Sequence, residues 1–455
     1  MEEISMEEEF SGLNLGDVRL NKRAIKLANR LMAKPTASIP MACESWSETQ
    51  AAYRFLANDS IDWHQILRPH QEQTEQRLGK HAVVLCLEDT TELDFNGQEI
   101  AGLGRLNYEQ RRGMYVHPTY AVTPQREPLG VLKLHMWARA DRVETVPDKD
   151  SPEKKGSQAA KEEITKESAR WIKGYEHVAH RAEHLPQTRL VYVADRESDM
   201  IELMWRAQQL GTPADWLIRA KHNRCLPESK RLWEHAAEGE PSGEMSFVMP
   251  SREGQKARTV RQQLWAKRVN LPMGKDQSVS VTCIVAQEIN APDGVKPVVW
   301  RLLTNREAPT LDDIIQLIDW YRARWEIEIF FHIFKNGCRI EALQLSQMDR
   351  IERALALFMV VSWRVAHLMR LGRTCPDLDA ALFFQPDEIR GTYLLMKKKP
   401  PEKTPTLNDV LRLIAQLGGF LARKCDGDPG VKTIWIGLQR VVDAVTTIQM
   451  LREEI

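Results

Sequence analysis

The chain has 455 residues, of which 43% are hydrophobic, and its formal net charge at pH 7 is zero. This length predicts two or three domains, and no stretch approaches the ~18 consecutive apolar residues of a membrane span. A net charge of zero argues mildly against nucleic-acid binding, which usually uses a basic domain. Whether the chain has a local basic patch depends on the positions of the charges.

The seven cysteines are scattered, without a CxxC pair or neighbouring histidines. This pattern favours a reducing cytoplasm and argues against structural zinc. Residues 1–9 are acidic, whereas a signal peptide needs a basic start and an apolar run. We therefore expect a cytoplasmic protein with no membrane contact.

A basic amphipathic helix is predicted within residues 10–34. Leu15-Gly16-Asp17 reads as a turn and an N-cap, and cations then recur at helical spacing. They are Arg19, Lys22, Arg23, Lys26, Arg30 and Lys34. Such a face either binds DNA or is simply solvated. Helices at 48–58 and 63–78 complete an all-helical segment of about 75 residues.

The pattern then changes to apolar runs of strand length. They lie at 82–87, 116–122, 131–136, 189–195 and 216–220, with helices predicted at 168–184 and 200–210 and a polar loop at 143–166. This order predicts a mixed sheet flanked by helices. Short alternating segments between Gly and Pro turns follow, and they predict a β-rich insertion at 225–300.

A Pro-free apolar run at 311–335 predicts one continuous helix that ends at a glycine. At ~100° per residue, four functional side chains share an arc of roughly 60°: Tyr321, Arg324, Glu328 and Lys335. Glu326 points to the other side. An exposed Arg324–Glu328 ion pair, worth only ~0.2–0.5 kcal/mol, is one interpretation. The many aromatic residues instead favour a buried helix, in which charges must be paired or bind a ligand.

Two aspartates provide partners for Glu328. Asp89 and Asp195 each end an apolar strand run, and neighbouring strand ends bring such groups close together. Three converging carboxylates repel one another and raise at least one pKa. Divalent cations remove the repulsion, and oxygen ligands suit Mg²⁺ or Mn²⁺. Two ions ~3.5–4 Å apart would support phosphodiester displacement.

Three motifs carry these residues: Leu87-Glu-Asp-Thr-Thr-Glu-Leu93, Val193-Ala-Asp-Arg-Glu-Ser-Asp199 and Tyr321-x-x-Arg324-x-x-x-Glu328-x6-Lys335. In this order and spacing they resemble the catalytic motifs of bacterial insertion-sequence DDE transposases. The resemblance is to the cut-and-paste branch with a Tyr-Arg-Glu-Lys signature, typified by the transposase of a kanamycin-resistance composite transposon. Further matching patches extend it over nearly the whole chain: Leu15-Gly-Asp17, Ala52-Tyr-Arg-Phe55, Arg219-x-Lys221-His222, Trp300-x-Leu-Leu-Thr304 and Leu417-Gly-Gly-Phe420.

The resemblance implies an α/β fold with an RNase H-like catalytic core. The core would comprise residues 76–224 and 301–372, interrupted by the β-rich insertion at 225–300. A helical domain at 1–75 would bind transposon-end DNA. A helical region at 373–455 would join two subunits, although its last helix could equally pack within the monomer.

The resemblance also implies roles for residues. Asp89, Asp195 and Glu328 would hold two Mg²⁺, for which Mn²⁺ can substitute. One site would then cut the transposon end, form and reopen a DNA hairpin, and join the 3′ end to double-stranded target DNA. The implied DNA contacts are Tyr321, Arg324, Lys335, Trp300, Arg219, Lys221, His222, Arg19, Lys22, Arg23 and Arg54.

Alternatives stay open for single residues and for the whole chain. Trp300 is either a core residue or a platform on which an extruded base stacks. The cations at 219–222 are either phosphate contacts or a solvated strand end. The chain itself could be an RNase H-like nuclease without strand transfer, or a non-catalytic DNA-binding inhibitor of transposition.

Overall fold

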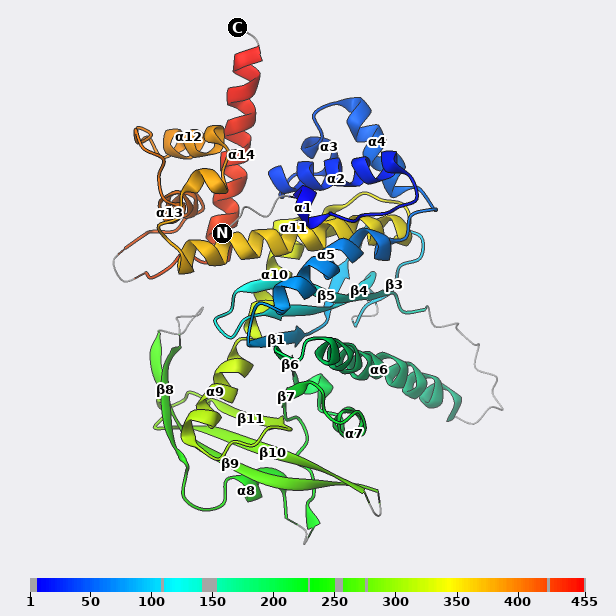
Figure 1. Cartoon of the computed structure of the whole chain (residues 1–455), viewed down its shortest axis with the longest axis vertical. Helices are drawn as coiled ribbons and strands as arrows, with labels where there is room; N and C mark the ends of the chain where they lie inside the picture. The colour runs from blue at the N-terminus through cyan, green and yellow to red at the C-terminus, as the bar shows by residue number, and fades with distance from the viewer. Residues whose placement is uncertain are drawn as a thin grey trace.

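The computed structural model describes residues 6–107, 110–140, 154–227, 230–249, 257–274, 277–423 and 426–453. Helices form its first part, as predicted (Figure 1). They are α1 Met6–Glu9, α2 Val18–Ala33, α3 Ile39–Ala42, α4 Trp46–Leu56 and α5 Trp63–Leu78. α2 begins where the sequence indicates, because Gly16 adopts a φ of 80° and the Asp17 side chain accepts a hydrogen bond from the backbone N–H of Arg19.

A buried ion pair connects α1, near the acidic start of the chain, to α5. The Glu9 side chain is 1% exposed, and its two oxygens accept hydrogen bonds of 2.9 Å from the Arg77 guanidinium of α5. The Nδ1 atom of His70 also contacts this carboxylate, while its Nε2 accepts the backbone N–H of Val131 at 3.0 Å. Burial alone would raise the pKa of Glu9, but His70 and Arg77 lower it to about 2.

An eleven-stranded mixed sheet lies at the centre of the described residues (Figure 1). Its main path is β2-β4-β1-β6-β7-β11-β10-β9-β8, and β3 and β5 both pair with β4. The strands are β1 Val83–Glu88, β2 Thr91–Asp94, β3 Gly104–Arg105, β4 Arg112–Val122, β5 Pro128–Trp137, β6 Arg189–Ala194, β7 Asp215–Arg219, β8 Gly243–Met249, β9 Arg258–Met273, β10 Gln277–Ile289 and β11 Val299–Thr304. The β1–β6 and β6–β7 pairs are parallel, which confirms the predicted mixed sheet.

The β-rich segment continues this sheet, because β11 pairs antiparallel with β7 and places Leu303 opposite Ile218. β10, β9 and β8 then follow outward, and the short helix α8 Leu232–Ala236 precedes them in the chain. β9 is longer than the short segments expected in this insertion, because it pairs with β10 over the full length of β10. The long β9–β10 ribbon is visible in the lower part of Figure 1.

Both faces of the sheet are covered. In β1, Leu85 and Leu87 join the core that includes α11, whereas Val84 and Cys86 join the core that includes α6 and α7. α6 is Lys154–His184 and α7 is Ile201–Gln209. The predicted loop was wrong for residues 154–166, which are helical because Lys, Glu, Ala and Gln favour a helix. Residues 143–153 of that loop lie outside the described residues.

α11, Met348–Thr374, is long and apolar enough to cross a membrane by length and composition alone. However, 89% of its apolar window is buried inside the protein, where it packs against α5 and β5. The helices that follow are α12 Pro386–Leu395, α13 Leu407–Leu417 and α14 Val431–Glu453. Figure 1 shows α14 running past α12 and α13 towards the C-terminal end of the chain.

Candidate catalytic site and DNA interface

The two strand-end aspartates lie at the same edge of the sheet. β1 and β6 are parallel neighbours, and Glu88 is paired with Ala194. Asp89 and Asp195 are the next residues of the two strands, so the chain leaves the sheet at a carboxylate on both. Asp195 also caps the short 3₁₀ turn η1, Arg196–Ser198, by accepting the backbone N–H of Glu197 at 2.8 Å. The predicted juxtaposition of the aspartates is therefore present.

Glu328 belongs to the same electrostatic cluster. Burial raises the pKa of Asp89 to about 7; the charges of Asp195 and Glu328 add to this rise, and Arg324 opposes it. Asp195 and Glu328 are thus close enough to Asp89 to disfavour its ionised form. Each comes from a different element, since Glu328 lies in α10, Trp325–His332.

Arg324 stands between these carboxylates. Its Nη1 lies 2.5 Å from an oxygen of Asp89, and its Nη2 lies 3.4 Å from an oxygen of Glu328. Within the described residues, no group of three His, Cys, Asp or Glu side chains is arranged to hold a metal ion. The chemistry of the donor set nevertheless fits a hard divalent cation, because three carboxylates outnumber the guanidinium that they surround.

The predicted continuous helix at 311–335 was wrong. α9, Leu311–Arg322, ends just before Arg324, whose backbone N–H bonds to the carbonyl of Tyr321 at 3.0 Å. The N–H of Ile327 in turn bonds to the carbonyl of Arg324 at 3.1 Å. These bonds span three residues instead of four, so the chain makes a tight turn before α10 begins. After α10, residues Ile333–Gly337 form a single π-helical turn, η3.

These breaks move Lys335 away from the arc of the helical wheel. Its Nζ donates to the backbone carbonyl of Glu92 at 2.7 Å and lies 3.2 Å from Glu341. Glu341 belongs to the short turn η4, Ile340–Ala342. Lys335 therefore contacts the segment that follows Asp89, and no contact with Glu328 is part of the described structure. Local π turns often occur at functional sites.

Tyr321 and Glu326 face different surroundings. Tyr321 is 7% exposed; burial raises its pKa, while the charges of Arg324 and Arg219 lower it. Arg219 is the last residue of β7, so that predicted contact lies beside Tyr321. Glu326 interacts instead with Arg126, Arg370 and Arg373. The two neighbouring glutamates are thus separated as the helical wheel indicates, despite the breaks.

Lys221 and His222 are exposed at the end of β7. Their backbone N–H groups, at 2.6 and 2.8 Å, donate to one oxygen of Asp199, which also pairs with Arg224 at 2.6 Å. The turn is therefore fixed by its backbone, and both side chains are left towards solvent. This arrangement agrees with both interpretations, a phosphate contact and a solvated strand end.

Trp300 is half-buried on β11. Its ring stacks on Phe247 of β8, with centroids 5.2 Å apart and an angle of 17° between the planes. The Arg322 guanidinium lies over the ring of Phe247 at 4.8 Å. Trp300 is thus part of a partly exposed stack rather than of the deep core. Its role on extruded DNA bases stays a prediction.

The basic face of α2 is divided in two. Lys26 and Arg30 turn towards α4 and pair with Glu48 at 3.4 and 2.8 Å. Arg19 is 90% exposed and contacts its own N-cap, Asp17, at 3.0 Å. The other predicted contacts of this domain are exposed or half-buried, namely Lys22, Arg23 and Arg54. Only part of the predicted basic stripe is therefore available to a partner.

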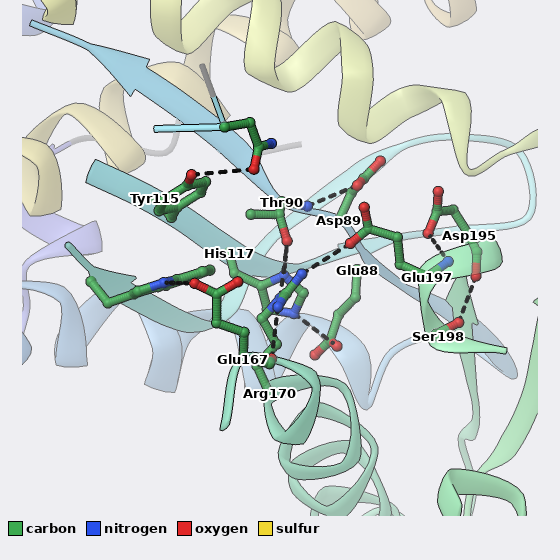
Figure 2. A network of polar contacts seen from close by, with 12 residues as sticks. Glu88, Asp89, Thr90, Tyr115, His117, Glu167, Arg170, Asp195, Glu197 and Ser198 are labelled. Carbon is green, nitrogen blue, oxygen red and sulfur yellow. Dashed lines mark hydrogen bonds and ion pairs between the residues drawn. The ribbon is translucent and has the colours of Figure 1, made fainter. Parts of the chain in front are cut away.

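A polar network beneath the aspartates was not predicted (Figure 2). Glu88 is fully buried, and its carboxylate contacts His117 at 3.2 Å, the Thr119 hydroxyl at 2.5 Å and the Tyr192 hydroxyl at 2.9 Å. These partners come from β4 and β6, so no local sequence motif predicts them. The sequence signal was the presence of a second acid, Glu88, inside an apolar strand, where a charge must find partners.

Three family models match the chain, in the order of the parts described above. A transposase DNA-binding model matches residues 4–61, and a transposase DDE domain model matches residues 163–363. A model of the transposase Tn5 dimerisation domain matches residues 360–453. The chain is thus similar, in order, to a transposase DNA-binding domain, a transposase DDE domain and the Tn5 transposase dimerisation domain. The DDE match spans Asp195 and Glu328, whereas Asp89 precedes it.

Among solved structures, the chain is similar to a cryo-EM structure of the piggyBac transposase synaptic complex with hairpin DNA. The identity is 9% and the TM-score 0.38, over 95% of this chain and 76% of that chain. A likeness at this level supports no conclusion about this chain. The family matches support DNA transposase activity, a DNA partner and dimer formation, and DDE domains generally use divalent metal ions.

Proposed function

We propose that the chain is a cut-and-paste DNA transposase. It cuts transposon ends by Mg²⁺-dependent hydrolysis and transesterification and joins the freed 3′ ends to target DNA. One observation carries the proposal: Asp89 and Asp195 follow two neighbouring parallel strands, and the Arg324 guanidinium contacts both Asp89 and Glu328. The three transposase family matches support it. The closer likeness to the transposase of the kanamycin-resistance composite transposon remains part of this proposal.

In this proposal the three carboxylates hold two Mg²⁺, with Mn²⁺ as a substitute. Divalent ions bound there would activate an attacking oxygen and stabilise the leaving oxygen of a phosphodiester. Arg324 lies between the carboxylates, where its guanidinium can reach a phosphate oxygen at the cleavage point. Tyr321 and Arg219 lie next to it, and Lys335 lies on the segment after Asp89.

The same phosphoryl displacement serves every step of the proposed reaction. Water cuts one strand, the new 3′-hydroxyl attacks the opposite strand to form a hairpin, and water reopens the hairpin. A hairpin forces a base out of the stack, and the partly exposed ring of Trp300 is suited to receive it. Arg219, Lys221 and His222 would contact the flanking phosphates.

The other parts of the chain supply DNA binding and assembly. The exposed and half-buried cations of α2 and α4 would bind the transposon end, with Arg19, Lys22, Arg23 and Arg54 as contacts. Residues 373–455 would join two protomers. Residues 1–75 would form the DNA-binding domain, and residues 76–224 and 301–372 would form the catalytic core, interrupted by the β-rich insertion at 225–300. We propose a cytoplasmic location, where the chain can reach bacterial DNA, and a homodimer in the DNA complex.

The test uses the purified full chain, Mg²⁺ and a supercoiled plasmid that carries the inverted ends flanking the gene. Denaturing gels detect hairpin ends, and amplification across new junctions detects joining. Hairpins with joined products support the proposal. Nicks without joining would instead identify an RNase H-like nuclease, and DNA binding without any cleavage would identify a transposition inhibitor. Either of these two results overturns the proposed function.

A further inference from the structure

Arg170 of α6 connects the two chain segments that carry the aspartates. Its side chain is 12% exposed, and its guanidinium lies 5.2 Å from the ring centroid of Trp171 and 5.3 Å from that of Trp137. Its Nε donates to the Thr90 hydroxyl at 3.2 Å, and its Nη2 pairs with Glu197 at 3.0 Å. One rigid, nearly buried group thus contacts two loops at once (Figure 2).

Each contacted residue is in turn bonded to an aspartate. The backbone N–H of Thr90 donates to an oxygen of Asp89 at 2.8 Å. The backbone N–H of Glu197 donates to an oxygen of Asp195 at 2.8 Å. The path from one carboxylate to the other therefore runs through Arg170, although Thr90 and Arg170 are 80 positions apart in the chain.

The Thr90 end of this path is fixed from behind. The Thr90 hydroxyl lies 2.9 Å from Nδ1 of His117, whose Nε2 lies 3.2 Å from the buried Glu88 carboxylate. One proton arrangement satisfies all three groups: Thr90 accepts from Arg170 and donates to His117, and His117 donates to Glu88. A Cβ at Gly174 would come within 2.1 Å of Glu88, so α6 packs directly on this carboxylate.

We propose that Arg170 and Thr90 are positioning residues that set the separation and orientation of Asp89 and Asp195 for divalent cations. This inference rests on the proposed function. The planar guanidinium can hold two acceptors at a fixed spacing, which a lysine ammonium on a flexible stem cannot do. Groups that orient metal ligands through hydrogen bonds change metal affinity when they are removed, even though they never touch the ion.

The test measures Mn²⁺ binding to the full-length protein by calorimetry, with thermal unfolding recorded for every variant. Arg170→Gln and Thr90→Val should each weaken Mn²⁺ binding by about 10- to 100-fold, and Thr90→Ser should stay within roughly threefold of the wild type. Arg170→Lys should behave like Arg170→Gln. Arg181→Gln is the matched control, because Arg181 also projects from α6 but pairs with Glu75.

Wild-type Mn²⁺ affinity in both Arg170→Gln and Thr90→Val would overturn the inference. If Arg170→Gln does not fold, the Thr90→Val and Thr90→Ser pair decides, because the two differ in whether the hydroxyl is kept. A loss of affinity in Thr90→Ser equal to that in Thr90→Val would also count against it. If the wild type binds Mn²⁺, the variants lose it and the wild type still fails to cut DNA, the positioning role stands and the proposed function fails.

Discussion

Arg324 holds its guanidinium against Asp89, with an Nη1–Oδ2 distance of 2.5 Å, although 235 positions separate the two residues in the chain. Arg324 is only 13% exposed, and Asp89 18%. The contact partly offsets the cost of bringing a carboxylate into this cluster, since burial and two further acids act against the ionised form. The ionisation of Asp89 thus depends on the balance between Arg324 on one side and burial and the two acids on the other.

The first prediction distinguishes two neighbouring glutamates. Glu328→Gln should lower DNA cleavage by a factor on the order of 10⁴, because it removes a proposed cation ligand from a unit that acts together. Binding of transposon-end DNA should be retained. Cleavage gels and fluorescence anisotropy measure the two properties separately.

Glu326→Gln is the control for that variant. Glu326 interacts with Arg126, Arg370 and Arg373 and not with the aspartates, so this variant should cut DNA at close to the wild-type rate. An inactive Glu326→Gln together with an active Glu328→Gln would show that the assignment of Glu328 is wrong.

The second prediction concerns pH. The pKa of Asp89 is raised from 3.8 to about 7, so its ionised form is disfavoured in the folded state. This cost is absent below about pH 4 and complete above about pH 7. With EDTA present, Asp89→Asn should therefore gain thermal stability relative to the wild type between pH 5 and pH 8, by roughly 1–5 °C. A constant difference across that range would contradict the assigned pKa.

The strand ends could be predicted from sequence, and the break between α9 and α10 could not. Apolar runs of strand length that end in Asp89 and Asp195 mark a sheet edge on their own. Ala323 and Arg324, by contrast, have ordinary helix propensities, so nothing local marks the tight turn between them. The Arg170 contacts could not be predicted from sequence either, because an arginine in a helix is expected to be solvated unless the strand that it faces is known.

The third prediction tests the buried Glu9–Arg77 pair. Glu9→Gln should lower the free energy of unfolding by about 3–5 kcal/mol, because it leaves a mostly buried guanidinium without its charge partner. The pKa of Glu9 is lowered from 4.5 to about 2. Its stabilisation is therefore complete above about pH 4.5 and is lost as the pH falls towards 2.

Thermal and urea unfolding of Glu9→Gln at pH 7 and pH 3 measure this effect. Its difference from the wild type should be larger at pH 7 than at pH 3. Glu7→Gln is the control, because Glu7 is exposed and accepts a hydrogen bond from Asn29 that a glutamine can also accept. Equal losses in the two variants would show that the Glu9 pair contributes no more than a surface contact.

The last prediction separates the two halves of the α2 basic face. Lys22 is exposed, whereas the Lys26 ammonium lies 3.4 Å from Glu48. If Lys22 contacts a phosphate, Lys22→Ala should reduce the slope of log affinity against log salt by about 1 for transposon-end DNA. Lys26→Ala should change the slope less, because Glu48 already neutralises that charge. Anisotropy titrations over a range of salt concentrations measure both slopes. Equal slopes for Lys22→Ala and the wild type would mean that DNA approaches the domain by another face. The exposed Arg54 of α4 would then be the next residue to substitute.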